Sequence, residues 1–312
     1  MRLQEGNLSS WLSYKLRGLK HRLQILKELP QLSARIATLD AASEILDQAS
    51  ALTHQINVLE NQVRTLSGFK SKIELGGAIH EPPLVEQWLR WKEEHIISDE
   101  PLVSICVATF NRAPLLIERC LSSLLAQSYH RLEIVVVGDG CTDDSAERVA
   151  ALNDPRVRWH NLPKRGIYPS QPELRWMVAG TTPVNVALSL CSGEFITHLD
   201  DDDEHLPQRV EKLVLHAKST QSDFVFHPFW AQVESMKWVL NEAVSPDYGL
   251  ITTSSVFYRS FFKCIAWDPY AYRQKEPGDW NRFRKILYFE PAISRFPEPL
   301  LHHYRERDQH NA

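Results

Sequence analysis

The chain has 312 residues, 43% of which are hydrophobic, and a formal net charge of −4. This length fits one large domain or two smaller ones. The ordinary hydrophobic fraction excludes a wholly disordered protein, and the near-neutral charge argues against a protein that chiefly coats nucleic acid. We therefore expect a globular protein without a nucleic-acid partner.

The cysteine and hydropathy patterns indicate a compartment. The five cysteines are scattered and form no C-x-x-C pair, which suits neither a zinc site nor a disulfide framework and favours a reducing environment. No apolar run approaches the roughly 18 residues of a membrane-spanning helix, and the N-terminus lacks the apolar core of a signal peptide. The sequence predicts a soluble, cytoplasmic protein.

Residues 1–70 have the apolar spacing of helices. Between Ile25 and Leu66 apolar side chains recur in alternating steps of four and three residues, with one slip near Ala42. This heptad pattern predicts a coiled coil, with a helix break near Pro30 because proline fits only the first helical turn. So narrow a seam buries little alone, so we expect a homo-oligomer; a helical hairpin packed on its own domain is the alternative.

The segment before this break is a basic amphipathic stretch. An apolar stripe with Trp11 runs along residues 8–27, flanked by lysines and arginines. Such a helix can lie on an anionic membrane surface. We favour a solvated helix that packs on the coiled coil, with weak peripheral contact at the inner face of the membrane as the alternative.

Residues 71–101 are expected to form a linker with one short helix, and residues 102–312 a second domain. From Leu102 onward, β-branched runs alternate with amphipathic segments. Strands are expected at 102–110, 132–137, 156–160 and 195–199, and helices at 113–127, 143–152, 183–191 and 207–219. This order predicts an α/β fold, a parallel sheet with helices on both faces, whose ligands bind beyond the carboxyl ends of the strands.

Carboxylates gather at one of those ends. The strand at 195–199 leads directly into Asp200-Asp201-Asp202-Asp203. Adjacent carboxylates repel one another, and a bound cation offsets that repulsion. Mg²⁺ or Mn²⁺, held by one or two carboxylates and by substrate phosphates, fits this position better than a solvated acidic loop does.

The end of the second strand excludes two common nucleotide sites. Gly138-Asp139-Gly140 lacks the third glycine of a dinucleotide fingerprint, because position 143 is aspartate, and no Walker A motif is present. Asp139 can instead accept a hydrogen bond from a pyrimidine imide or from ribose. A simple role in the turn is the alternative.

The segment from Val103 to Leu213, with its motifs TFNR, GDG, PVNVAL and DDDD, resembles the nucleotide-sugar domain of family-2 glycosyltransferases. The resemblance implies a GT-A fold, which is Rossmann-like, and transfer of a sugar with inversion. It also implies a UDP- or GDP-linked donor, an acceptor hydroxyl on an unidentified sugar or glycoconjugate, and Mn²⁺ or Mg²⁺ as cofactor.

The resemblance also assigns site residues. It implies that the nucleoside is held by Thr109, Phe110, Arg112 and Asp139. Of the D-x-D motif, Asp200 and Asp201 are expected to bind the donor and Asp200 and Asp202 the metal, with Asp202 the preferred direct ligand. The donor side would also include Asn185. At the far end of the domain, His302-His303-Tyr304 would offer a metal or diphosphate contact through His302, unless these are surface histidines.

Asp279 is the expected catalytic base. Inverting transfer needs a group that takes the proton of the attacking hydroxyl. The family carries that carboxylate in an E-D- or G-D-W-like motif before a helix, which matches Glu276-Pro277-Gly278-Asp279-Trp280 here. Helix capping is the alternative role for Asp279, and Glu276 is the reserve candidate.

The chain departs from the family pattern in two places. Gly138 stands where many relatives carry an aspartate, so base recognition rests more heavily on Asp139. The loop Lys164–Thr182 is longer and more aromatic than the family minimum; it either folds over the donor, with Arg175 or Trp176 reaching the site, or decorates the surface.

Two other functions remain open from the sequence. A nucleotidyltransferase acting on sugar phosphates uses a related sheet and acidic metal site, but it would want a glycine-rich basic loop that Thr109–Arg112 lacks. A non-catalytic coiled-coil scaffold with a nucleotide-binding domain is the other alternative. The intact aspartate run and Asp279 argue against it.

Overall fold

The computed structural model describes residues 82–305. The predicted coiled coil, its break near Pro30 and the basic stretch 8–27 lie outside the described residues. Within them, none of the helices has both the length and the apolar composition that crossing a bilayer requires.

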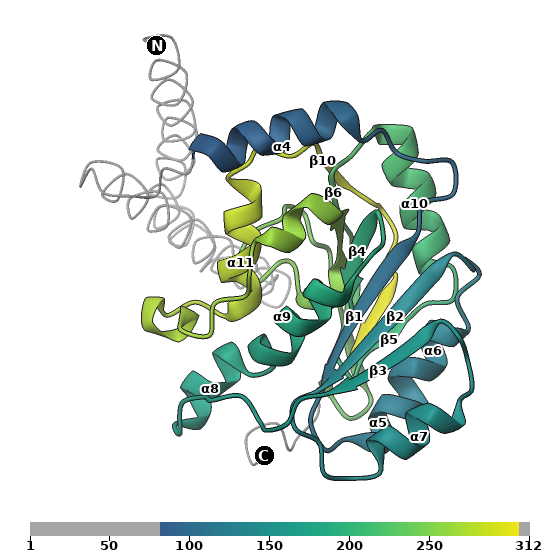
Figure 1. Cartoon of the computed structure of the whole chain (residues 1–312), viewed down its shortest axis with the longest axis vertical. Coiled ribbons are helices and arrows are strands. Elements are labelled where there is room, and N and C mark those ends of the chain that lie inside the picture. The colour runs from purple at the N-terminus through teal and green to yellow at the C-terminus, as the bar shows by residue number, and fades with distance from the viewer. Residues whose placement is uncertain (1–81, 306–312) are drawn as a thin grey trace, which may run out of the picture. The chain divides into compact units, whose positions relative to one another are not determined.

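A seven-stranded sheet forms the centre of the described domain (Figure 1). Its order is β10-β6-β9-β4-β1-β2-β3. The strands are β1 (Val103–Thr109), β2 (Leu132–Gly138), β3 (Val157–Asn161), β4 (Phe195–His198), β6 (Phe224–Phe226), β9 (Val256–Arg259) and β10 (Ile293–Arg295). The four strands expected from the sequence are all present, within two residues at each end.

The sheet is mixed rather than wholly parallel, which corrects the prediction. Strands β4, β1, β2 and β3 are parallel as expected, but β9 runs antiparallel to both β4 and β6. The chain enters β9 from η2, a short 3₁₀ turn (Thr253–Ser255), rather than from a crossover helix. Only parallel neighbours require such a crossover.

Helices cover both faces of the sheet. They are α4 (Pro82–Glu94), α5 (Ala113–Leu115), α6 (Ser122–Leu125), α7 (Ser145–Ala151), α8 (Pro172–Val178), α9 (Thr181–Leu190), α10 (Arg209–Thr220) and α11 (Gly278–Leu287). A π-helical stretch, η1 (Leu116–Leu121), joins α5 to α6, so the predicted helix 113–127 is one continuous segment. Two further 3₁₀ turns are η3 (Ser260–Cys264) and η4 (Ala271–Gln274).

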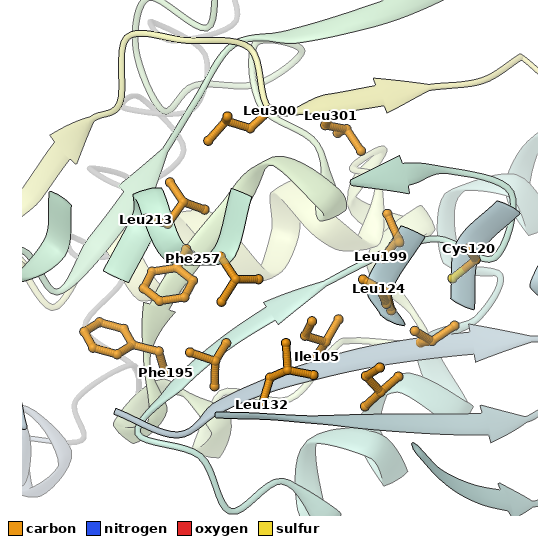
Figure 2. Packing of buried hydrophobic residues seen from close by; sticks show 14 of the residues in the cluster. Ile105, Cys120, Leu124, Leu132, Phe195, Leu199, Leu213, Phe257, Leu300 and Leu301 are labelled. Carbon is orange, nitrogen blue, oxygen red and sulfur yellow. The ribbon is translucent and has the colours of Figure 1, made fainter. Parts of the chain in front are cut away.

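Alternation along the buried strands creates two hydrophobic clusters. In β1, Ile105 belongs to the cluster under α6, α7 and α10, whereas its neighbour Cys106 belongs to the cluster under α4, α9 and α11. Successive strand residues point to opposite faces, so a strand covered on both faces reads as a continuous apolar run. Figure 2 shows the first cluster, in which the rings of Phe195 and Phe257 stack with centroids 4.6 Å apart.

The helix expected inside the linker packs on this domain. Trp88 of α4 is only 1% exposed and lies against Phe262, with ring centroids 4.6 Å apart. Lys92 forms an ion pair with the buried Asp223. The compact unit accordingly begins at Pro82, so this part of the segment 71–101 belongs to the domain.

A second, four-stranded sheet lies beside the aspartate run. Its order is β5-β11-β7-β8, with β5 (Glu204–His205), β7 (Phe229–Glu234), β8 (Lys237–Asn241) and β11 (Leu301–His303). Strand β5 directly follows the four aspartates, and β11 pairs with it so that His302 lies opposite Glu204. This pairing brings the end of the domain back to the acidic residues.

Candidate active site

A cavity of about 530 Å³ opens where β1, β2 and β4 end. Its volume lies in the range of small-molecule sites. The sequence-predicted residues that line it are Thr109, Phe110, Arg112, Asp139, Asp200, Asp201, Asp202 and Asp279. The structure therefore brings the three strand ends and the start of α11 to one cavity.

The ends of β1 and β4 are braced together by side chains. These strands run parallel with Cys106 opposite His198, so Thr109 comes beside the aspartate run. Its hydroxyl donates to Asp201 Oδ2 at 2.7 Å. The Arg112 guanidinium donates to Asp201 Oδ1 at 3.2 Å and to Asp202 Oδ2 at 2.8 Å.

Charge in this brace is incompletely balanced. Burial and the neighbouring Asp202 carboxylate raise the pKa of Asp201 to about 6, although Arg112 opposes the shift. Burial and the other carboxylates also raise the pKa of Asp200 well above its usual range. A cation at this place would relieve the repulsion.

Asp200, Asp203 and His303 form a cluster suited to a metal ion. One ligand atom from each lies within 4.8 Å of the others. Asp203 accepts from His303 Nδ1 at 2.9 Å and from the Tyr304 backbone N–H at 2.9 Å. Burial disfavours a charged imidazole, but Asp203 outweighs that effect and raises the pKa of His303 to about 9. Two carboxylates and an imidazole are a donor set that Mn²⁺ accepts readily, and Mg²⁺ through its oxygens.

This cluster differs from the predicted ligand set. Asp202 lies in the ion pair with Arg112, while Asp203 lies with Asp200. His302 points elsewhere: its Nδ1 is 3.5 Å from Glu204 Oε2, and its ring lies 5.2 Å from that of Trp238. Successive residues of β11 face opposite sides of the strand, so only one of the two histidines can meet the aspartates.

Asp139, expected to recognise the base, is buried and held by the loop Lys164–Thr182. Its Oδ1 accepts from the Gly166 N–H at 2.8 Å, and its Oδ2 accepts from the Tyr168 hydroxyl at 2.7 Å. Burial and this hydrogen bond raise the pKa of Tyr168. Gly140, at φ +72°, lets the loop approach this closely, because a Cβ there would lie 2.5 Å from the backbone nitrogen of Arg165.

The same loop therefore reaches the cavity rather than decorating the surface. The Arg165 guanidinium lies 3.7 Å from the centre of the Phe110 ring, a cation–π contact. Farther along, Arg175 and Trp176 of α8 also line the cavity. The length and aromatic content of the loop indicate in the sequence that it could reach the donor, but they do not single out Arg165 and Tyr168.

Asn185 has a different place from the one expected. Its amide donates to the Trp267 carbonyl at 2.9 Å and accepts from the Trp267 N–H at 2.8 Å. It is absent from the cavity lining, whereas Trp267 is part of it. In this structure Asn185 positions the segment that carries Trp267.

Asp279 stands at the start of α11, half-buried in the cavity wall. The capping residue of this helix is Pro277, so Asp279 is not its N-cap; it accepts from the Trp280 N–H at 2.6 Å. Burial raises the pKa of Asp279. The reserve candidate Glu276 instead binds Arg284 at 2.7 Å and does not line the cavity.

Comparison with known proteins identifies the family. The model for "Glycosyl transferase family 2" matches residues 104–269, more than half of the chain. The chain is 36% identical over 121 residues to the hyaluronan synthase of Pasteurella multocida, covering 38% of this chain and 11% of that one. It is 32% identical over 119 residues to the amylovoran biosynthesis glycosyltransferase AmsE of Erwinia amylovora, covering 38% and 41%. The chain thus spans less than half the length of these curated relatives.

A solved structure shares the fold. The chain resembles in its fold the crystal structure of S. aureus TarS 1–349 in complex with UDP-GlcNAc, with a TM-score of 0.53 and 19% sequence identity. The alignment covers 67% of this chain and 60% of that one. At this identity the likeness concerns the fold.

Proposed function

The chain belongs to glycosyl transferase family 2, and we propose that it transfers a sugar from a nucleoside-diphosphate donor to an acceptor hydroxyl, with inversion and with a divalent metal. The observation that carries the proposal is one cavity with strand-end carboxylates on one wall and Asp279 on another. Inverting transfer needs these two kinds of group: one side for a charged leaving diphosphate and one base for the acceptor.

The nucleoside would lie at the ends of β1 and β2. Phe110 offers a flat ring, and Asp139 offers acceptor oxygens to an imide N–H or to ribose hydroxyls. The fold neighbour TarS is solved with UDP-GlcNAc, so UDP-linked donors are the first to test, with GDP-linked donors second.

The diphosphate would lie beside Asp200, Asp203 and His303, which would hold Mn²⁺ or Mg²⁺. When bound, the metal neutralises charge that develops on the leaving diphosphate. Arg112 and Thr109 keep the neighbouring carboxylates in place before the donor arrives, which spares reorganisation during the reaction.

Asp279 would take the proton from the acceptor hydroxyl as that oxygen attacks the anomeric carbon. A base works best when its pKa approaches the working pH, and burial moves the pKa of Asp279 in that direction. Its carboxylate lines the cavity, where an incoming hydroxyl could reach it.

The test begins with calorimetry of UDP binding to the full chain. UDP should bind with Mn²⁺ or Mg²⁺, and binding should weaken by more than tenfold with chelator or in Asp200→Asn. Glu204→Gln is the matched control, because this neighbouring carboxylate lies outside both the cavity lining and the cluster. Equal UDP affinity with and without metal would contradict the metal assignment.

A screen of UDP- and GDP-sugars, read as released nucleoside diphosphate, then identifies the donor. Turnover of at least one nucleotide sugar is expected. If none is hydrolysed or transferred although UDP binds, the proposed reaction is wrong.

A further inference from the structure

Three aromatic side chains gather on the cavity wall around Asp279. Trp176, Tyr248 and Trp280 all line the same cavity. The rings of Tyr248 and Trp280 have centroids 6.1 Å apart at an interplanar angle of 57°. Trp176 remains 53% exposed and Tyr248 38% exposed. The rings of Trp176 and Tyr248 are therefore accessible to a ligand rather than buried in the hydrophobic core.

Three separate segments supply these aromatics. Trp280 follows Asp279 in the first turn of α11, Tyr248 lies between β8 and η2, and Trp176 lies in α8. Helix α8 reaches the start of α11, since a Cβ on Gly278 would lie 3.2 Å from the Met177 carbonyl oxygen. Trp176 precedes Met177 in the chain and Asp279 follows Gly278, so both lie next to this contact between α8 and α11.

Charge effects agree with this proximity. Burial raises the pKa of Tyr248, and the nearby carboxylates of Asp279 and then Glu276 add to the shift. The phenol is thus close enough to Asp279 to feel its charge. A molecule that presents a hydroxyl to Asp279 would meet the Tyr248 and Trp280 rings at the same time.

The chemistry of this wall fits a sugar ring. A pyranose has faces of C–H groups, which pack on aromatic rings, and a rim of hydroxyls, which need polar partners. Beside the aromatics, Thr252, Thr253 and Asp279 line the cavity with hydroxyl and carboxylate groups. A lipid chain would leave these polar groups without partners, which costs free energy.

We infer that this aromatic wall is an acceptor subsite that binds a pyranose ring of a carbohydrate acceptor, with Trp280 and Tyr248 at the reacting sugar and Trp176 of α8 extending the wall. This inference rests on the proposed function and adds the class of acceptor to it. It also gives the long loop Lys164–Thr182 a role: its first part contacts Asp139, and its helix helps select the acceptor.

Saturation-transfer NMR tests the subsite without a known acceptor. The full chain with UDP and the diamagnetic Mg²⁺ is mixed with the methyl pyranosides of glucose, galactose, mannose and N-acetylglucosamine, and separately with octyl β-D-glucoside. Ring protons of at least one methyl pyranoside should be saturated. In Trp176→Ala and Trp280→Ala, binding should weaken about 3- to 10-fold, the range expected for an aromatic contact.

Tyr270→Ala is the matched control, because Tyr270 is 55% exposed like Trp176 but lies outside the cavity lining; it should leave the signal unchanged. UDP titration of each variant reports whether the donor side is intact. If Trp280→Ala loses UDP binding, the half-exposed Trp176 decides the question alone.

Three results would overturn the subsite. They are equal saturation in wild type and Trp176→Ala, no saturation of any methyl pyranoside while UDP binds, and saturation confined to the octyl chain, which would indicate a lipid acceptor. Failure of UDP itself to bind would instead count against the proposed function.

Discussion

The two walls of the cavity are built differently. On the strand-end wall, side chains brace one another: Thr109 and Arg112 hold Asp201, and His303 holds Asp203. On the other wall, Asp279 is held by backbone N–H groups, and Trp176 is half exposed. Carboxylates held in place in this way suit a cation that would neutralise a leaving diphosphate, because they need no reorganisation when it binds. A base must instead stay free to take a proton.

The largest expected effect is that of replacing Asp279, which should lower turnover without lowering donor affinity. Asp279→Asn keeps the size of the side chain and an oxygen for the Trp280 N–H, but it removes the basic carboxylate. Because general-base catalysis contributes about 10²- to 10⁴-fold, turnover should fall by that factor, while UDP affinity stays within a few-fold. Released diphosphate and calorimetry measure the two quantities.

Glu276→Gln is the control for this substitution. Glu276 binds Arg284, so its replacement should lower stability rather than selectively lower turnover. Normal turnover of Asp279→Asn would show that Asp279 is not the base. A joint loss of binding and turnover would assign it a structural role.

The next effect concerns what lies behind the strand-end wall. Arg209 is buried; it donates to the Ser254 carbonyl and to His227 Nε2, and the Ser254 hydroxyl donates to Asp203. Arginine has no acceptor, so His227 Nε2 carries the lone pair and its Nδ1–H donates to the Pro228 carbonyl at 2.8 Å. Burial, with Arg209, holds the pKa of His227 well below its usual range.

The sign of the pH effect follows from this shift. Because the pKa of His227 is lower in the folded chain than in the unfolded chain, the unfolded chain binds more protons at acid pH. The contribution of neutral His227 to stability is therefore fully present above about pH 6.5 and is lost as the pH falls below it. Because of His227, the free energy of unfolding should fall by about 1.4 kcal/mol when the pH is lowered from 7.5 to 5.5. Asp201, with its raised pKa, acts in the opposite sense, so the comparison must be made against a variant.

Denaturant unfolding of wild type and His227→Gln at the two pH values isolates this contribution. Glutamine can accept from Arg209 and donate to the Pro228 carbonyl. The variant should therefore lose less stability than wild type on acidification. Identical pH slopes would show that His227 does not titrate on unfolding.

The smallest expected effect is at the loop that joins the two walls. The Tyr168 hydroxyl donates a hydrogen bond to Asp139, the carboxylate proposed to bind the nucleoside of the donor, and Asp139 is only 3% exposed. Tyr168→Phe removes this competitor, so UDP should bind about 3- to 5-fold more tightly, within the net value of one hydrogen bond. Calorimetry with UDP checks it, with Tyr129→Phe as a hydroxyl control remote from the cavity. Weaker UDP binding would mean that Tyr168 contributes to binding of the UDP nucleobase instead of competing with it.

Much of the donor side could be predicted from the sequence. The strands around Ile105 and Val135 are continuous apolar runs, and parallel strands place their carboxyl ends together. That rule alone brought Thr109, Asp139 and the aspartate run to one cavity. The helix at Asp279 was expected for another reason, the match of Glu276-Pro277-Gly278-Asp279-Trp280 to a family motif.

Tertiary structure decided what depends on pairing between distant segments. The direction of β9, the packing of α4 on η3 and the attachment of Asn185 to Trp267 all join residues far apart in the sequence. The preference for His303 over His302 depends on how β11 pairs with β5 and β7. A one-residue change in that register would exchange the two histidines. Local patterns specify helices, strands and their ends, whereas the register of distant strands is set by packing over the whole domain, and it is the register that selects which side chains meet.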